Sequence, residues 1–301
     1  MICDEHGDVE PHSHYTHDWN GPRRDARHDS PSAVALHNAE IPPSLQRASL
    51  DFINPLKQTL DADQTKLLPN LVGPALYDPF SASVRILTNN LRQLRLWAVV
   101  DESLFRLEDA SQSPWSNLEI LKIMLHPLRP DGSWYFHEPH GQGRNAVGYE
   151  IIVDSYPPFE ISELDEDMHD LDNKSSLNSC SNEFRVVPDE TRLKPFLEGS
   201  ARTAARMCSL KRAIIWSPTY WDPEWDDEEA QDYDNVFYRQ RPYWGIQYSD
   251  QDNGVWGSLL PYPIGPSEDK KDDPAMRCLI WMVSKWRPDT ELRNLFQYLG
   301  R

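Results

Sequence analysis

The sequence predicts an α/β fold, a leucine-rich-repeat-like open solenoid with a mainly parallel sheet, outer helices and long inserted loops. Three segments carry a leucine at offset zero and small apolar residues at offsets three and five, a spacing typical of strands in such repeats: Leu91-Leu94-Leu96, Leu118-Leu121-Ile123 and Leu210-Ala213-Ile215. The first two begin at residues 91 and 118, a separation inside the ~20 to 29 residue period of these repeats. Helical spacing precedes the first and third segments, as a helix then strand unit requires.

Side chains alternate between the two faces of a strand, so each repeat segment divides into a buried set and an outward set. The buried set is expected to form the core of one parallel sheet and consists of Leu94, Leu96, Leu121, Ile123 and Ile215. The outward set falls into three columns when the segments are aligned: Gln93 with Ile120 and Arg212, Arg95 with Lys122 and Ile214, and Trp97 with Met124 and Trp216.

Large apolar and cationic side chains on a nominally exposed face need an explanation. One explanation is a concave partner-binding surface, because Trp, Met and Arg are favoured at the centres of interfaces. The other is that the loops of residues 217–265 fold back and cover this face. Under the first explanation the residues expected to contact a partner are Arg95, Trp97, Lys122, Met124, Arg212 and Trp216.

The chain is expected to divide into three parts. Residues 1–42 are predicted to be a disordered, His-rich acidic tail, because they hold six of the ten histidines and few large apolar residues. Residues 43–77 are predicted to be a short helical lead-in, since apolar residues recur at roughly helical spacing from residue 44 to 60, although Pro55 interrupts them. The leucine-rich-repeat-like domain is expected over residues 78–301.

Within this domain the first predicted helix covers about residues 81–90, with Ser81 as its N-cap, and the first strand covers 94–99. A short helix on the outer side is expected between residues 101 and 117. Insertions are expected at about 138–182 and 217–275. Further strands are predicted at 121–124, 133–136, 184–187, 211–216, 244–248 and 279–283, and further helices at 195–208 and from 288 to about 299.

Charge and hydropathy restrict the classes of partner. The net charge is −18, from 48 acidic against 30 basic residues, which opposes binding to nucleic acid or to an anionic membrane surface. No N-terminal apolar signal and no run of about 18 apolar residues is found. We therefore expect a soluble intracellular protein, cytoplasmic or nuclear, whose partner is another protein.

The sequence offers little support for a catalytic or metal centre. The cysteines, Cys3, Cys180, Cys208 and Cys278, form no C-x-x-C pair, so reduced structural thiols are expected. The densest metal-like motif, His12-Ser-His14 with His17, lies in the predicted tail. Phosphate-binding and serine-hydrolase motifs are absent from the sequence. We therefore expect no cofactor, no metal and no catalytic residue.

An acidic stretch among aromatic residues is the second candidate contact region. It consists of Asp226, Asp227, Glu228 and Glu229, with Trp221 and Trp225 nearby. Two interpretations remain open at this point. The stretch is either a solvated acidic loop or a docking patch for a basic partner.

Four motifs carry a resemblance to a known family: Leu91-Arg-Gln-Leu-Arg-Leu-Trp97, Trp115-Ser-Asn-Leu-Glu-Ile-Leu-Lys-Ile-Met124, Asp131-Gly-Ser-Trp-Tyr-Phe136, and Trp286-Arg-Pro-Asp289 with Leu295-Phe296. With these, residues 78–301 resemble the C-terminal region of fungal F-box-like proteins. The resemblance implies a target-selecting leucine-rich-repeat-like part, joined in that family to an F-box that docks on a Skp-type adaptor of a cullin ubiquitin ligase.

Residues 41–72 depart from the F-box pattern. They offer Ile41-Pro-Pro-Ser-Leu45 in place of a Leu-Pro-x-Glu-like start, and one helix interrupted by proline. The module is lost, or the gene model is truncated, or the protein is a stand-alone binding scaffold. A Skp-type adaptor is accordingly not an expected partner.

These observations favour a non-enzymatic protein–protein interaction scaffold, with target recognition related to F-box ubiquitin-ligase receptors as the finer hypothesis. The alternative is an enzyme of unrecognised class that uses acidic and aromatic loop residues. A pocket with buried, convergent Asp, Glu or His would favour the enzyme, and an open sheet face would favour binding.

Overall fold

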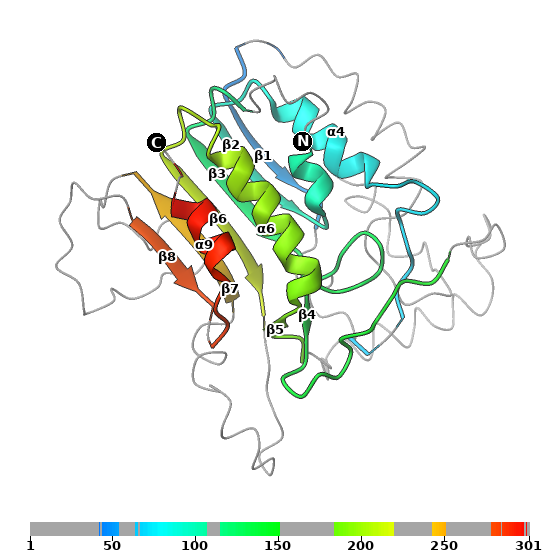
Figure 1. Ribbon diagram of the computed structural model, residues 1–301. Coiled ribbons are helices and arrows are strands. Elements are labelled where there is room, and N and C mark those ends of the chain that lie inside the picture. The colour runs from blue at the N-terminus through cyan, green and yellow to red at the C-terminus, as the bar shows by residue number, and fades with distance from the viewer. Residues whose placement is uncertain are drawn as a thin grey trace, which may run out of the picture.

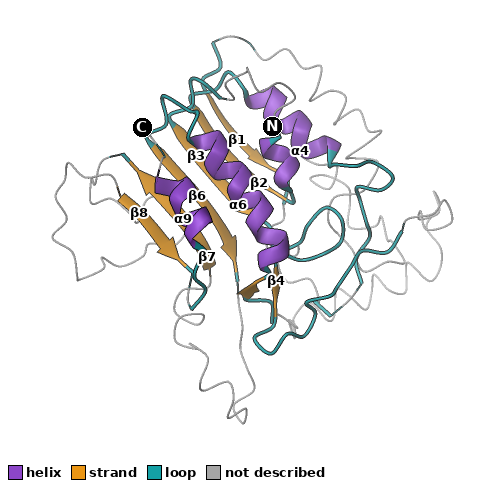
Figure 2. Ribbon diagram, in the orientation of Figure 1, coloured by secondary structure: helices purple, strands orange, loops and turns teal. Residues whose placement is uncertain are grey.

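A six-stranded sheet with helices packed on one of its faces is the framework of the protein (Figures 1 and 2). The computed structural model describes residues 42, 44–53, 64–65, 67–106, 115–150, 184–219, 243–250, 278–283, 285–297 and 299. The fold is mixed α/β, as predicted. Its sheet is mainly parallel, with three α-helices in the described part of the chain.

The strands lie in the order β1-β2-β3-β6-β7-β8. The first four are parallel to one another, and the last two run antiparallel to their neighbours. A separate antiparallel pair joins β4 (Phe136–His137) to β5 (Val187–Pro188). The bounds of the six main strands are Arg47–Asp51 for β1, Gln93–Ala98 for β2, Ile120–Leu125 for β3, Arg212–Pro218 for β6, Tyr243–Ser249 for β7 and Cys278–Met282 for β8.

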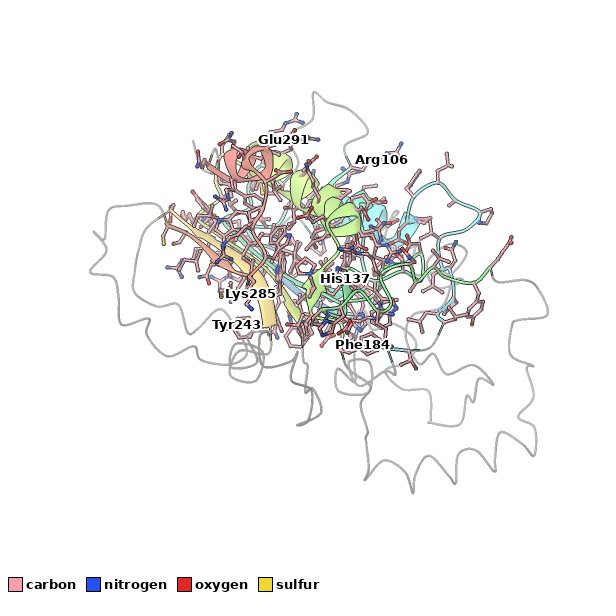
Figure 3. The ribbon with its side chains drawn as sticks, turned by 60° about the horizontal axis from the view of Figure 1, so that its bottom comes forward. Arg106, His137, Phe184, Tyr243, Lys285 and Glu291 are labelled. Carbon is pink, nitrogen blue, oxygen red and sulfur yellow. The ribbon has the colours of Figure 1, made fainter. Side chains whose placement is uncertain are left out.

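The helices lie on one side of the sheet (Figure 1): α4 (Pro79–Thr88), the single 3₁₀ turn η2 (Glu102–Phe105), α6 (Glu190–Ala204) and α9 (Thr290–Gln297). In the view from the carboxyl ends of the parallel strands, Glu291 on α9 lies on the helix side and Tyr243 lies across the sheet from it (Figure 3). Lys194 on α6 pairs with Asp289, 2.6 Å away, which ties α6 to the start of α9.

The main core lies between the sheet and these helices. The parallel register places Leu94 beside Leu121, and Leu96 beside Ile123, which in turn lies beside Ile215. All five side chains are buried together with the apolar stripe of α6, including Leu193, Phe196 and Leu197. The prediction that these five residues form the core of one parallel sheet is confirmed.

The segment expected to begin a helical lead-in is a strand over Arg47–Asp51, so the helical prediction is wrong there. Ala48 and Leu50 alternate toward the core, a spacing of two that favours a strand, whereas the helical interpretation relied on larger residues at wider spacing. Backbone bonding fixes the choice, since the amides of Arg92 and Gln93 donate to the carbonyl of Gln46 at 2.8 and 3.0 Å. The strand is therefore an edge of the parallel sheet.

Helix starts also differ from the predictions, because aspartates supply the caps. Asp78, not Ser81, is the N-cap of α4, and its carboxylate accepts from the Ser81 amide at 3.0 Å. In α6 the cap is Asp189, so that helix begins at Glu190 and contains Pro195. The short helix expected after β2 is the 3₁₀ turn η2. The strand predicted at 184–187 is the two-residue strand β5, which begins at Val187 and ends at Pro188.

Several predictions concern residues outside the described ranges. Among them are residues 1–41 of the predicted tail and most of both predicted insertions. Among the described residues, none of the helices combines the length and apolar character that crossing a bilayer requires.

We predict that Leu121→Ala lowers the free energy of unfolding by about 2 to 5 kcal/mol, because it leaves a cavity in the middle of the core. Leu121 is 3% exposed, between β2 and β6. The matched control is Leu76→Ala, since Leu76 is 98% exposed and its truncation leaves no cavity. Denaturant midpoints measure both changes, and equal midpoints for the two variants would contradict the packing described here.

Candidate functional site

The face of the sheet opposite the helices carries the residues predicted to contact a partner. We call it the helix-free face, because none of the helices in the described part of the chain lies on it. The register places Arg95 beside Lys122, Lys122 beside Ile214, and Ile120 beside Arg212. Trp97 lies beside Met124, and Met124 beside Trp216. The three columns aligned from the sequence are therefore three neighbouring rows across β2, β3 and β6.

The Trp97, Met124 and Trp216 row is largely interior. Met124 is 0% exposed and Trp216 is 5% exposed, and both belong to a second apolar cluster with Ile53, Ile214, Tyr243 and Met282. Trp97 is half-buried at the margin of this cluster, with its ring 6.2 Å from that of Trp216 in an edge-to-face arrangement. Burial of such side chains is favourable by roughly 1.5 to 3 kcal/mol each, which explains why they pack together. Met124 and Trp216 thus point as predicted but are not open to a partner.

The helix-free face differs between its two halves. Over β6 and β7 it is closed, since Ile214, Gln247 and Ser249 are all buried. Over β1 to β3 its side chains, apart from that of Met124, are exposed or half-buried, and we call this part the open half. It comprises Arg47, Ser49, Asp51, Gln93, Arg95, Trp97, Ile120 and Lys122, with Arg212 at its margin.

Three cations, here called the basic triad, gather on the open half: Arg95, Lys122 and Arg212. The pKa of Lys122 is lowered, first by burial and then by the two neighbouring arginines. Arg95 places its guanidinium 4.1 Å from the centroid of the Trp97 ring. Within the described ranges, none of the triad forms an ion pair with a carboxylate.

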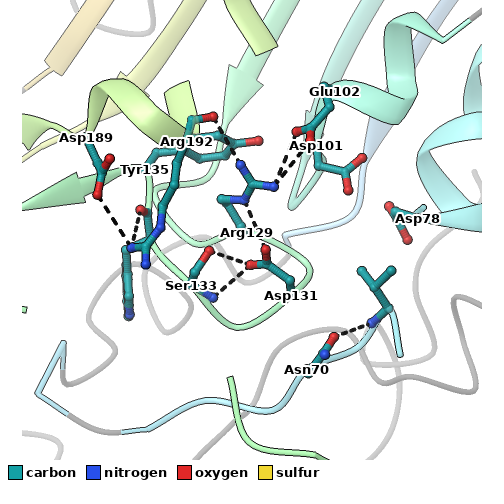
Figure 4. A network of polar contacts seen from close by, with 12 residues as sticks. Asn70, Asp78, Asp101, Glu102, Arg129, Asp131, Ser133, Tyr135, Asp189 and Arg192 are labelled. Carbon is teal, nitrogen blue, oxygen red and sulfur yellow. Dashed lines mark hydrogen bonds and ion pairs between the residues drawn. The ribbon is translucent and has the colours of Figure 1, made fainter. Parts of the chain in front are cut away.

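A second candidate site lies where β2 and β3 end, at the carboxyl edge of the parallel strands (Figure 4). A cavity of about 460 Å³ is lined there by Asn70, Tyr77, Asp101, Arg106, Arg129 and Asp131, among others. Arg129 lies at the centre of the polar contacts. Its guanidinium is 3.3 Å from Glu102 and 3.4 Å from Asp131, and it donates to the carbonyl of Arg192 at 3.1 Å.

Two aspartates beside this cavity join α4 to η2 by a reciprocal pattern of hydrogen bonds. Asp78 caps α4 and Asp101 caps η2, the latter accepting from the Ser103 amide at 2.8 Å. In return the Asp78 amide donates to the Ser103 hydroxyl at 3.2 Å, and the Asp101 amide donates to the Ser81 hydroxyl at 3.3 Å. Each aspartate thus caps its own element and is bonded to the serine of the other.

Burial makes this arrangement sensitive to protonation. Asp101 is 6% exposed, and burial together with the charge of Asp78 raises its pKa to about 7. A carboxyl group with that pKa at a cavity wall can gain or lose a proton near neutral pH. The described residues contain no group of three His, Cys, Asp or Glu side chains arranged to hold a metal ion.

The sequence analysis missed the second site, although a local signal was present. Asp78-Pro79-Phe80-Ser81 places a capping residue before a proline at the first helical position, a helix-start signature. Asp101 comes three residues after the end of β2, at the edge where side chains from neighbouring parallel strands converge. What the sequence does not show is that Arg129 lies between Glu102, Asp131 and the carbonyl of Arg192.

The acidic stretch Asp226, Asp227, Glu228 and Glu229 lies outside the described residues, as do the loops expected to cover the helix-free face between 220 and 242. Comparisons with protein-family models, with curated proteins and with solved structures give no match for this chain.

We predict that Asp101→Asn stabilises the protein at pH 8 and has little effect at pH 4. The folded-state pKa of about 7 exceeds the ordinary value of 3.8, so between these values the folded chain holds a proton that the unfolded chain has lost. Stability of the parent protein therefore falls as pH rises through this window. The amide keeps the bond from the Ser103 amide without that penalty.

The gain at pH 8 should be about 4 kcal/mol, measured by urea unfolding at a series of pH values. Glu291→Gln, at a carboxylate exposed on α9, is the control and should leave the pH profile of the parent unchanged. A variant Asp101→Asn whose stability ran parallel to the parent from pH 4 to 8 would show that Asp101 has no raised pKa.

Proposed function

We propose that this protein is a non-enzymatic protein-binding scaffold that uses the open half of the helix-free face. The observation that carries the proposal is the pair formed by Arg95 and Trp97, which lies beside Lys122 on a part of the sheet that no helix of the described ranges covers. Arg and Trp are the residue types that most often dominate binding energy at interfaces.

The packing of Trp97 favours this role. The Trp97 ring packs edge-to-face against the buried Trp216 ring, and the Arg95 guanidinium lies over the Trp97 ring. The Trp97 indole is therefore held in place before any partner binds. A side chain that is already ordered loses little conformational entropy on binding. The same stack gives the site an apolar centre with a cationic rim, which is the usual anatomy of an interface.

The arrangement of the sheet supports the finer proposal of a leucine-rich-repeat-like solenoid. β1, β2, β3 and β6 are parallel and lie side by side in the order in which they occur along the chain, with the separate β4 and β5 pair between β3 and β6 in sequence, and the connecting helices lie on one side. In a solenoid the opposite side is the concave surface that binds partners. A relation to F-box ubiquitin-ligase receptors rests on the sequence motifs and belongs to the same proposal.

An enzyme of unrecognised class is the second candidate, and one observation favours it. Asp101, with its pKa near neutrality, lines the cavity beside Asp131 and Arg106. Perturbed carboxyl groups in a cavity are a common feature of active sites, although structural ion-pair networks also produce them. The two functions separate cleanly, because an enzyme would lose activity in Asp101→Asn, whereas a scaffold would lose its partner in Trp97→Ala.

We predict that Trp97→Ala reduces recovery of the protein's partner in affinity purification by more than about tenfold, since truncating a central aromatic anchor costs ~2 kcal/mol or more. Tyr77→Ala is the matched control. Tyr77 is also partly exposed and also carries a stacked guanidinium, that of Arg106 at 4.5 Å, but it lines the cavity instead. Equal recovery by the parent and Trp97→Ala would refute the proposed surface.

We also predict that a Skp-type adaptor is not recovered with the protein, because residues 41–72 lack the Leu-Pro-x-Glu-like start and form a strand over Arg47–Asp51. Immunoblotting of the same purifications for adaptor and cullin measures this. Stoichiometric adaptor in the eluate would instead indicate a ubiquitin-ligase receptor.

A further inference from the structure

We infer that the partner presents an acidic peptide segment, containing a large apolar residue, to the basic triad and Trp97. This inference rests on the proposed function and adds the chemistry of the partner. Its evidence is separate from that for the Arg95 and Trp97 pair. It comes from a comparison of cations on this sheet that are paired with a carboxylate and cations that are not.

Neighbouring cations on the same strands provide the contrast. Arg92, just before β2, and Lys211, just before β6, both bind the carboxylate of Glu119, with Lys211 at 2.9 Å. The single carboxylate of Glu119 thus neutralises two cations, one beside each neighbouring strand. Arg95, Lys122 and Arg212 lie one to three residues further along the same strands, where no described carboxylate is within ion-pair distance of them. Asp51 lies on the same face beside Trp97, but its carboxylate accepts from the Ile53 amide at 3.0 Å.

The triad is electrostatically unfavourable while it stands alone. Lys122 is partly desolvated and faces two positive neighbours, and both effects favour loss of its proton. A carboxylate placed among the three would remove this repulsion and pair with groups that are already positioned. Such complementarity contributes mainly to the specificity and to the rate of association.

The net charge of the chain favours a short acidic segment over other anions. At −18 the protein as a whole repels nucleic acid and anionic membranes, whose charge extends far beyond three cations. A peptide segment places a few carboxylates on the triad and keeps the rest of the partner at a distance. Its apolar residue would lie on the half-buried indole of Trp97, in line with the apolar centre of the open half.

The test uses fluorescence anisotropy with the full-length protein and two labelled peptides, one alternating Glu with Leu and one with Gln in place of every Glu. We expect the Glu peptide to bind, with an affinity that falls as salt is added, and the Gln peptide not to bind. Arg95→Gln with Lys122→Gln should weaken binding by about tenfold or more. Arg95→Gln alone, at an exposed position, should weaken it partly and guards against misfolding of the double variant.

Arg202→Gln is the matched control, because Arg202 is 60% exposed on α6, on the opposite side of the sheet. It should bind the Glu peptide as the parent does. The inference is overturned if both peptides bind alike, if Arg202→Gln weakens binding as much as the double variant, or if a polythymidine oligonucleotide binds more tightly than the Glu peptide. It is also overturned if the Glu peptide binds only after Asp226, Asp227, Glu228 and Glu229 are neutralised, since the chain itself would then supply the acid.

Failure here is distinguishable from failure of the proposed function. A protein that loses its natural partner in Trp97→Ala yet ignores the Glu peptide keeps its role as a scaffold but has a partner of different chemistry. If the Trp97→Ala variant still binds the natural partner, the open half is not the binding surface and the proposed function itself is refuted.

Discussion

In-register packing of aliphatic side chains across β2, β3 and β6 is the constraint on which both faces of the sheet depend. Leu94, Leu121 and Ala213 form one row and Leu96, Ile123 and Ile215 the next, and α6 packs over them. Because side chains alternate along a strand, this packing also fixes what points the other way. A slip of one residue would bury Arg95 and Lys122 beneath α6, so the cationic surface and the core are selected together.

The ends of the elements follow a different principle, in which polar groups are satisfied at the cost of electrostatic strain. Asp78 caps α4 and its amide donates to Ser103 of η2, while Asp101 caps η2 and its amide donates to Ser81 of α4. These bonds fix the position of α4 relative to η2. The same geometry places two carboxyl groups near one another in a buried setting. Order at the carboxyl edge of the sheet is therefore gained by tolerating a carboxyl group that holds its proton to near neutral pH.

The repeat spacing was sufficient to predict the central strands, their register and the rows of the helix-free face, because each depends only on local alternation. It was insufficient for burial. Met124 and Trp216 become interior only when Ile53, Tyr243 and Met282, distant in sequence, pack beside them. Likewise β1 is a strand because the free edge of β2 offers hydrogen bonds, which no local pattern around Pro55 reveals. The cavity residues were not predicted for the same reason, since Arg129 and Asp101 line one cavity only because β2 and β3 end at the same edge of the sheet.

Two antiparallel steps, from β6 to β7 and from β7 to β8, bring β8 back to the direction of β1, β2, β3 and β6. A further strand beyond β8 can therefore run parallel to β8 through the same kind of helical crossover that connects the parallel strands, and α9, which follows β8, already lies on the helix side. Among the described strands the two edges of the sheet, β1 and β8, thus run in the same direction. Lengthening of the sheet by helix and strand units is compatible with either edge.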